Sequence, residues 1–194
     1  IEKNPNFFEE LKKDFNLESL IETGLFYLDE KKKIYVERFR GRLIFPINNI
    51  SGQPIALGGR IIEKSDYLAK YINSPETNFF KKGSNLYNLD SARKLSNKLN
   101  NIYLVEGYMD VVGLSKNGIE NAVANLGTSL TDKQIITLNQ FFDDIVICFD
   151  GDESGYKAAL RAAENSIRDL KPEKQISFLF LPTNEDPDSF VNKN

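Results

Sequence analysis

Short apolar runs alternate with helical patterns in the second half of the chain. Apolar residues dominate the segments 102–106, 120–124, 144–149 and 175–181, which are bounded by polar or turn-forming residues and are predicted strands. Between them, residues 109–117, 131–142 and 154–170 have the spacing of helices, with Thr131-Asp132 and Ser154 as candidate N-caps. This alternation predicts an α/β fold in which helices flank a parallel sheet.

The first half of the chain has a different pattern. Residues 7–22 carry Phe and Leu at helical spacing until Gly24 ends the pattern, and residues 90–100 are again helical in character. Between them, the turn-rich segment Asn48–Gly52 separates two apolar stretches, 43–47 and 55–57, which predicts a small antiparallel sheet. We therefore expect a partial α+β subdomain over residues 1–97 and a separate α/β domain over residues 98–194.

Carboxylates follow three of the predicted strands in pairs. The pairs are Glu106 and Asp110, Asp150 and Asp152, and Asp186 and Asp188. Ligands of such sheets bind beyond the carboxyl ends of the strands, where these residues lie. Two carboxylates about 4 Å apart repel by roughly 1 kcal/mol in water and by about 4 kcal/mol at an effective dielectric constant near 20. A divalent cation would offset that repulsion, so the pattern predicts a site for Mg²⁺ or Mn²⁺.

Each acidic pair taken alone also has an ordinary explanation. Asp-Gly is common in exposed turns at strand ends, and Asp150–Gly155 resembles the first half of an EF-hand calcium loop. The calcium loop fails because its twelfth position is Arg161, where a bidentate Glu is required, and because the segment follows a strand. The coincidence of three pairs at one sheet edge is what indicates metal binding.

Composition excludes several classes of protein. A hydrophobic content of 41% is typical of a globular protein, and no apolar run approaches the roughly 20 residues that span a bilayer, so we expect no membrane partner. The chain has no His and one Cys, which excludes the usual zinc site, and no zinc is expected in this chain. Cys148 lies in an apolar run and is predicted to be a buried thiol in a reducing cytoplasm. Because the chain begins with Ile1 and not Met, we expect it to be a piece of a longer protein.

Charge is distributed unevenly along the chain. The net charge is −5 over residues 1–30, +9 over residues 31–100 and −7 over residues 101–194. Arg38, Arg40 and Arg42 alternate, so on a strand they would share one face, which suits a phosphate backbone. A charged edge strand gives the same pattern, and Lys70 and Lys82 also fit ordinary loops, so the residues alone leave both explanations open.

Longer strings carry a family resemblance. Glu106-Gly-Tyr-Met-Asp110, Phe149-Asp-Gly-Asp152 and Asp186-Pro-Asp188 resemble the Toprim domain shared by topoisomerases, primases and some nucleases. From about residue 17 onward the chain resembles bacterial DNA primase of the DnaG type, in the strings Glu37–Arg42 with Leu43–Ile47, Gly58–Arg60, Lys70–Thr77, Phe80–Gly83, Leu86-Tyr87 and Ala124–Thr128. Ala69, Ser154 and Tyr156 depart from the family pattern without removing a carboxylate or a matched lysine.

The resemblance implies an activity and partners. Proteins of this family synthesise short RNA primers on single-stranded DNA during replication, so NTPs, the template and the nascent primer are the expected partners, with more than one Mg²⁺ or Mn²⁺ ion as cofactor. The expected location is the cytoplasm, at the replication fork. The replicative helicase is expected to bind through a domain absent from this chain, and the family's zinc-binding domain and C-terminal helical part are also absent.

The resemblance also assigns roles to individual residues. It implies catalytic roles for Glu106, Asp110, Asp150 and Asp152, and metal ligation by Glu106, Asp150, Asp152, Asp186 and Asp188. It implies nucleotide binding by Lys70, Asn73 and Lys82, and template binding by Arg38, Arg42 and Arg60.

Two rival functions share the acidic residues. A Toprim nuclease or topoisomerase would use the same carboxylates, but residues 37–77 resemble primase specifically. A Toprim scaffold that binds DNA without catalysis is the non-enzymatic alternative, and such scaffolds can lose acidic residues that are all present here.

Overall fold

The computed structural model describes residues 7–127, 129–166 and 172–193, and contacts divide the chain into two compact units. The first unit is formed by the chain up to Ile47 and by Pro54–Lys81. The second unit is formed by Lys82–Asn194 together with the short segment Asn48–Gln53. The first unit holds a two-stranded and a three-stranded sheet, and the second unit holds a four-stranded sheet.

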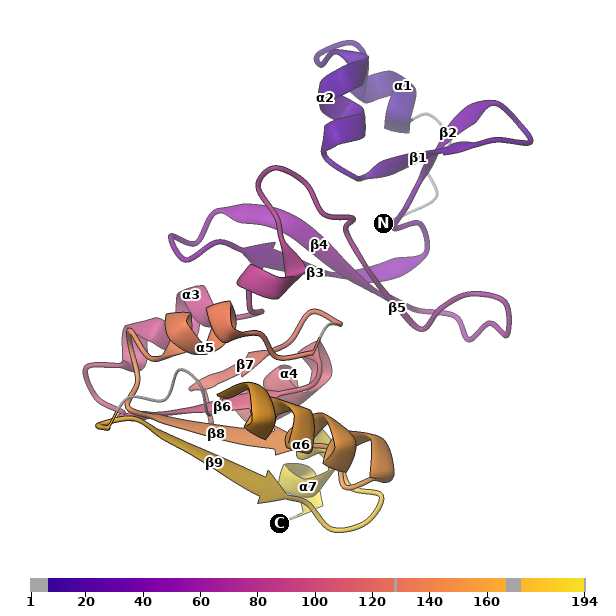
Figure 1. Ribbon diagram of the computed structural model, residues 1–194. Helices are drawn as coiled ribbons and strands as arrows, with labels where there is room; N and C mark the ends of the chain where they lie inside the picture. The colour runs from indigo at the N-terminus through magenta and orange to yellow at the C-terminus, as the bar shows by residue number, and fades with distance from the viewer. Residues whose placement is uncertain (1–6, 128, 167–171, 194) are drawn as a thin grey trace. The chain divides into compact units, whose positions relative to one another are not determined.

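The first unit is a mixed α and β structure (Figure 1). It begins with two short helices, α1 (Phe7–Leu11) and α2 (Leu17–Glu22), and the antiparallel pair β1 (Phe26–Asp29) and β2 (Ile34–Glu37). A three-stranded sheet follows in the order β3 (Arg42–Asn48), β4 (Pro54–Ile61) and β5 (Tyr71–Asn73). The α+β character expected of this part is confirmed.

The single helix predicted over residues 7–22 is two helices. The first helix ends at Leu11, and Asn16 begins the second, because its Oδ1 accepts the N–H of Ser19 at 2.8 Å and so caps α2. Gly24 stops α2 as predicted, with a left-handed φ of +67°, and a Cβ at this position would lie 2.6 Å from the ring of Pro75.

The second unit contains the predicted parallel sheet. Its strands are β6 (Asn101–Val105), β7 (Ala122–Ala124), β8 (Asp144–Phe149) and β9 (Gln175–Phe180), in the order β7-β6-β8-β9. All three neighbouring pairs are parallel. The helices are α3 (Leu89–Ala92), α4 (Tyr108–Lys116), α5 (Asp132–Leu138), α6 (Glu153–Ser166) and α7 (Pro187–Lys193), with the 3₁₀ turns η1 (Lys82–Ser84) and η2 (Arg93–Leu95).

Helices cover both faces of this sheet (Figure 1). Successive strand residues point to opposite sides, and apolar residues on both sides pack against helices. Ile102 and Leu104 of β6 belong to one apolar cluster, which includes residues of α3, α5 and α6. Val105 belongs to the other cluster, which includes residues of α4 and α7, and the buried Cys148. The α/β architecture expected of residues 98–194 is confirmed.

The helix ends differ in detail from the sequence pattern. Thr131 caps α5 as predicted, but α6 begins at Glu153, so Asp152 occupies the N-cap position in place of Ser154. Residues 167–170 of the predicted helix lie outside the described residues. With 14 residues, α6 is the longest described helix, and no helix in the described ranges is long and apolar enough to cross a membrane.

The division between the units does not coincide with the boundary predicted after residue 97. Residues 82–97 group with the sheet because Leu89 and Ala92 of α3 are buried in its core. The segment Asn48–Gln53 groups there too, and Asn48 Nδ2 donates to Oδ2 of the buried Asp90 at 3.0 Å. The boundary after residue 97 stays a prediction about domains.

Candidate active site

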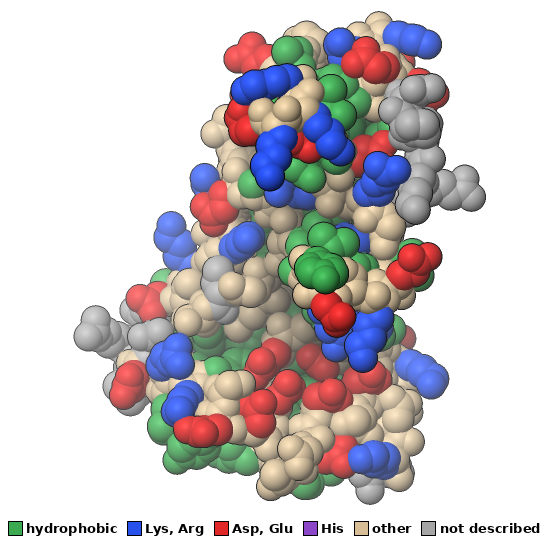
Figure 2. Space-filling view, turned by 90° about the vertical axis from the view of Figure 1, so that its right-hand side faces the viewer, with side chains coloured by type: hydrophobic (Ala, Val, Ile, Leu, Met, Phe, Trp, Pro, Cys, Tyr) green, Lys and Arg blue, Asp and Glu red, His purple; other side chains and the backbone are tan. Residues whose placement is uncertain are grey.

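The acidic residues lie at the carboxyl edge of the parallel sheet. Glu106 follows β6 and Asp150 follows the neighbouring strand β8. The N–H of Asp150 donates to Oε1 of Glu106 at 3.3 Å, which places these two residues side by side. Figure 2 shows acidic side chains gathered on one face of the second unit, in the lower part of the view. The predicted convergence of the first two acidic pairs is thus present.

The peptide of Gly151 connects the second acidic pair to the third. Its N–H donates to Glu185 O at 2.8 Å, and its carbonyl accepts the N–H of Asn184 at 3.2 Å. The backbones approach so closely that a Cβ on Gly151 would lie 2.1 Å from Pro182 O. Only glycine fits such an approach, and the segment that leads into Asp186 is thereby held beside Asp150.

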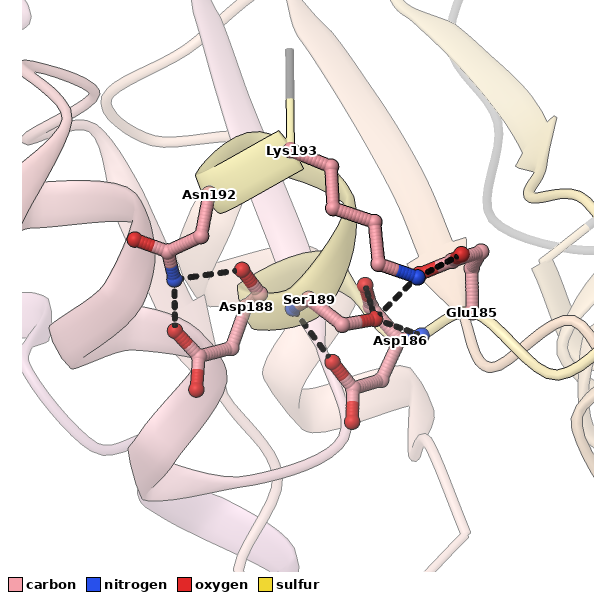
Figure 3. A network of polar contacts seen from close by, with 6 residues as sticks. All are labelled: Glu185, Asp186, Asp188, Ser189, Asn192 and Lys193. Carbon is pink, nitrogen blue, oxygen red and sulfur yellow. Dashed lines mark hydrogen bonds and ion pairs between the residues drawn. The ribbon is translucent and has the colours of Figure 1, made fainter.

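Three of the acidic residues also fix the first turns of helices. Oδ2 of Asp110 accepts the N–H of Gly107 at 2.9 Å at the start of α4. Oδ1 of Asp152 accepts the N–H of Gly155 at 2.7 Å at the start of α6. Oδ1 of Asp186 accepts the N–H of Ser189 at 2.6 Å at the start of α7 (Figure 3). Carboxylates favour such positions because they satisfy orphan N–H groups and complement the helix dipole.

Asp188 has a different environment from Asp186. Its Oδ1 accepts a hydrogen bond from Nδ2 of Asn192 at 2.7 Å, and Figure 3 shows that each of the two carboxylates has its own partner. Oδ1 also faces α4, since a Cβ on Gly113 would lie 2.1 Å from it. Pro187 begins a helix, so Asp186 and Asp188 are not two residues apart on an extended segment. Metal ligation by Asp188 stays a prediction.

Burial and mutual repulsion raise the pKa of the inner carboxyl groups. Burial raises the pKa of Asp110 to about 7, and the charge of Asp150 adds to the effect. Burial raises the pKa of Asp150 to about 6, helped by the charges of Glu106, Asp186 and Asp152. Shifts of this kind show that five carboxyl groups influence one another at this edge.

The pKa values of Glu106 and Asp152 shift in opposite directions. Burial raises the pKa of Glu106, which the hydrogen bond from Asp150 N–H opposes. The pKa of exposed Asp152 is lowered, first by the hydrogen bond from Gly155 N–H and then by the Ser154 hydroxyl. At neutral pH the edge therefore combines a fully ionised carboxylate with buried groups whose ionisation is costly.

The donor atoms at this edge fit a hard divalent cation. Oδ1 of Asp150 is buried and has no hydrogen-bond partner within the described residues. Carboxylate oxygens are the ligands that Mg²⁺ and Mn²⁺ prefer, and a cation would offset the repulsion seen in the pKa of Asp110 and Asp150. Across the ranges 7–127, 129–166 and 172–193, however, no three acidic, His or Cys residues form a ready-made ligand set.

In the first unit, Arg60, Lys70 and Asn73 lie together on the β4–β5 pair. Arg60 faces Tyr71 across the strands, and Gly58 faces Asn73. The guanidinium of Arg60 and the ammonium of Lys70 lie 5.9 and 5.7 Å from the ring centre of Tyr71. The sequence reasoning missed Tyr71, although its position between Lys70 and Asn73 was the available signal.

Arg38, Arg40 and Arg42 do not alternate along one strand as predicted. Arg38–Gly41 form a turn between β2 and β3, so these side chains have separate environments. Arg38 Nε donates to Gly24 O at 2.9 Å, whereas Arg42 is 5% exposed and its Nη1 donates to Ala69 O at 2.8 Å. Burial lowers the pKa of Arg42. The three arginines nevertheless line one pocket of about 510 Å³.

Lys82 belongs to the second unit, in η1. Its carbonyl accepts Nε2 of the fully buried Gln134 at 3.1 Å, and the same Nε2 donates to Asn85 O at 2.9 Å. Thr131 Oγ1 adds a bond to Gly83 O at 2.6 Å. The sequence reasoning missed Gln134, for which the spacing Thr131-x-x-Gln134 of a capping box was the signal.

The string Ala124–Thr128 is described except for its last residue. Asn125 and Leu126 are buried beyond β7, and Gly127 has a left-handed φ of +78°. Thr128 lies outside the described residues. The DNA-binding, nucleotide-binding and metal-binding roles assigned to individual residues all stay predictions.

Two family models match the chain. The model for the DNA primase catalytic core, N-terminal domain, matches residues 2–93, and the model for the Toprim domain matches residues 100–180. The sheet with the acidic carboxyl edge is therefore that of a Toprim protein.

Among Toprim proteins, the chain is similar to DNA primases. A DNA primase of Pseudomonas aeruginosa is 44% identical over 178 residues, which cover 92% of this chain and 26% of the relative. The crystal structure of a DNA primase domain from the same organism is 44% identical, with a TM-score of 0.86 over 92% of this chain and 55% of that chain. A structure of the DnaG primase catalytic domain bound to ssDNA is 41% identical, with a TM-score of 0.84 over 91% of this chain and 56% of that chain.

The chain belongs to the DNA primase family of the DnaG type. It spans about a quarter of the length of the curated relative that it matches.

Proposed function

We propose that this chain is the nucleotidyl-transfer part of a DNA primase, which synthesises short RNA primers on single-stranded DNA from NTPs with divalent metal ions. The observation that carries the proposal is the contact between Asp150 N–H and Glu106 Oε1 at the carboxyl edge of the sheet, among carboxyl groups that raise each other's pKa. Family membership adds support, because a DnaG primase catalytic domain whose structure contains bound ssDNA is 41% identical to this chain.

Glu106, Asp150 and Asp152 are the proposed cation-holding residues, with Asp186 beside them. When bound, a divalent ion supplies the Lewis acidity that lowers the pKa of a primer 3′-hydroxyl and offsets the charge of the triphosphate. Asp110 fixes the first turn of α4, and its carboxyl group interacts electrostatically with those of Asp150, Asp186 and Glu106. Glu106 is also a candidate general base, and both general-base catalysis and metal ligation would require its ionised carboxylate.

Lys70, Asn73 and Lys82 are the proposed contacts to the nucleotide, and Arg38, Arg42 and Arg60 to the template. Arg60 and Lys70 already share Tyr71 as a neighbour, so a phosphate near this ring would meet two positive charges. Arg42 is the least accessible of the six, and its guanidinium also holds the backbone at Ala69.

Replacing Asp150 tests the proposal. We expect Asp150→Ala to abolish RNA primer synthesis on a single-stranded template with Mn²⁺ or Mg²⁺, and to weaken Mn²⁺ binding, while template binding is largely retained. Asp144→Ala is the matched control, because Asp144 begins the same strand at its opposite end, and it should retain both activities. Primer synthesis by Asp150→Ala at the wild-type rate would contradict the assignment.

The rival functions predict other results. A Toprim nuclease or topoisomerase would cleave or relax plasmid DNA with Mg²⁺, and such activity by the wild-type chain would favour that class. A non-catalytic scaffold would bind neither Mg²⁺ nor Mn²⁺ in a direct titration. The proposal requires metal binding without plasmid cleavage.

A further inference from the structure

A buried amide oxygen beside the acidic edge has no hydrogen-bond partner in the described part of the chain. Asn125 directly follows β7, and its N–H donates to Val105 O at 3.3 Å, which extends the pairing of β7 with β6. Its side chain is 8% exposed, and its Oδ1 is buried and unpaired. Leaving such a group unpaired costs roughly 1–3 kcal/mol, so its presence calls for an explanation.

The amide lines a pocket that also includes Glu106. The pocket has a volume of about 140 Å³, and Leu130, Phe149 and Ala158 form apolar walls. Ser129 adds one hydroxyl group. A water molecule needs only about 10–15 Å³ of such space when polar partners are present, so the pocket has room for several.

Unpaired acceptor oxygens follow the strands on either side of Glu106, since β6 lies between β7 and β8. Oδ1 of Asn125 and Oδ1 of Asp150 are both buried and unpaired among the described residues, and Asp150 contacts Glu106 through its N–H. A group of acceptor oxygens requires a cation or a donor to satisfy it. A hydrated divalent ion supplies both, because Mg²⁺ retains several waters when one or two carboxylates bind it, and those waters donate hydrogen bonds.

We propose that Asn125 is a positioning residue of the cation site, whose Oδ1 accepts a hydrogen bond from a water of the divalent ion held by Glu106 and Asp150. The inference rests on the proposed function, since it requires that the acidic edge binds such an ion. A water of the bound ion then supplies the donor that no described protein group supplies to Asn125 Oδ1. This role accounts for an unpaired amide oxygen at a position where an apolar side chain would make the metal-free fold more stable.

Three side chains of similar size at residue 125 test the proposal. Mn²⁺ affinity is measured from the electron paramagnetic resonance signal of free Mn²⁺, and the Tm of the metal-free chain is measured in parallel. We expect Asn125→Leu to weaken Mn²⁺ binding about tenfold, as loss of a hydrogen-bonding neighbour of a metal typically does. Its metal-free Tm should not fall, because an apolar group replaces an unpaired polar one. Asn125→Asp should bind Mn²⁺ at least as tightly as the wild type.

Asn139 provides the matched control. Its Oδ1 is also buried and unpaired among the described residues, but it lies at the C-terminal end of α5, away from the carboxyl edge. Asn139→Leu should leave Mn²⁺ affinity unchanged.

The proposal is overturned if Asn125→Leu binds Mn²⁺ within twofold of the wild type, or if Asn139→Leu weakens binding equally. If Asn125→Leu lowers both the Tm of the metal-free chain and the Mn²⁺ affinity, Asn125 has a structural role, and the proposal is overturned as well. A wild-type chain that binds no Mn²⁺ would instead refute the proposed function itself.

Discussion

Asp110 holds a carboxyl group whose pKa is about 7, in the first turn of α4. Because an unfolded Asp has a pKa near 3.9, the folded state retains this proton over a range in which the unfolded state loses it. The metal-free protein therefore loses stability as pH rises from about 4 to about 7, and the loss is complete above that range. Burial is the main cause of the shift, and the charge of Asp150 is the second.

Asp110→Asn should reduce this pH dependence, and the part that comes from the raised pKa of Asp150 should remain. At pH 8 without metal we expect the variant to be more stable than the wild type by about 2 kcal/mol, and the difference should shrink toward pH 4. Urea unfolding at both pH values measures it. Asp66→Asn, at an exposed loop position, should change stability by less than about 0.5 kcal/mol at either pH. Parallel pH curves for Asp110→Asn and the wild type would contradict the prediction.

The sequence predicted the contact between Glu106 and Asp150, because both follow strands whose carboxyl ends share one edge. It could not predict the direction of Asp188. Spacing of two residues places side chains on one side only in an extended segment, and Pro187 begins a helix there. The burial of Arg42 could not be predicted either, since it depends on carbonyl groups at residues 59 and 69, far away in sequence.

At the scale of elements, Gln134 ties α5 to the turn that carries Lys82. One side chain satisfies Lys82 O and Asn85 O and also accepts the N–H of Thr131 at 3.1 Å. Since the side chain is completely buried, water cannot replace these bonds.

Gln134→Met, which keeps the shape and removes the amide, should lower the free energy of unfolding by about 2 kcal/mol or more. The matched substitution Gln140→Met, at an exposed position, should cost less than about 0.5 kcal/mol. Urea denaturation followed by circular dichroism provides the comparison. Equal stability of the two variants would show that the amide contacts contribute little.

The parallel sheet was predictable as an element pattern because apolar runs and helical spacing alternate so clearly from residue 101 onward. The residues at which helices begin were harder to predict. Asp152 caps α6 ahead of Ser154 because its carboxylate reaches the N–H of Gly155, and the two residues are equally good caps by type. The sequence shows a glycine at residue 151 but not why glycine is required there. The requirement comes from the backbone of Pro182, which only the fold brings near.

At the scale of the whole molecule, charge separates along the chain, with residues 31–100 at +9 and residues 101–194 at −7. Such a separation suits a protein that must hold a polyanion and cations at once, because each charged surface attracts its own ligand. Binding of single-stranded DNA should therefore weaken steeply as salt is added.

Arg60→Gln should weaken single-stranded DNA binding and reduce the slope of log affinity against log salt by about 0.7, the value for one phosphate contact. Lys31→Gln is a charge-matched control at the exposed β1–β2 turn, and its slope should equal that of the wild type. Fluorescence anisotropy over a range of salt concentrations measures both. Equal slopes for Arg60→Gln and the wild type would remove Arg60 from the proposed template contacts.

The hairpin tip Asn48–Gln53 has a consequence for how the Toprim sheet can be exchanged between proteins. Asp90 is 9% exposed, and Asn48, 42 positions earlier, is its hydrogen-bond partner. A gene segment that starts at residue 82 would encode Asp90 and every strand of the parallel sheet but not this tip. Grafting of that segment alone would leave Asp90 without its partner Asn48, so a graft that keeps this contact has to carry two separate stretches of sequence.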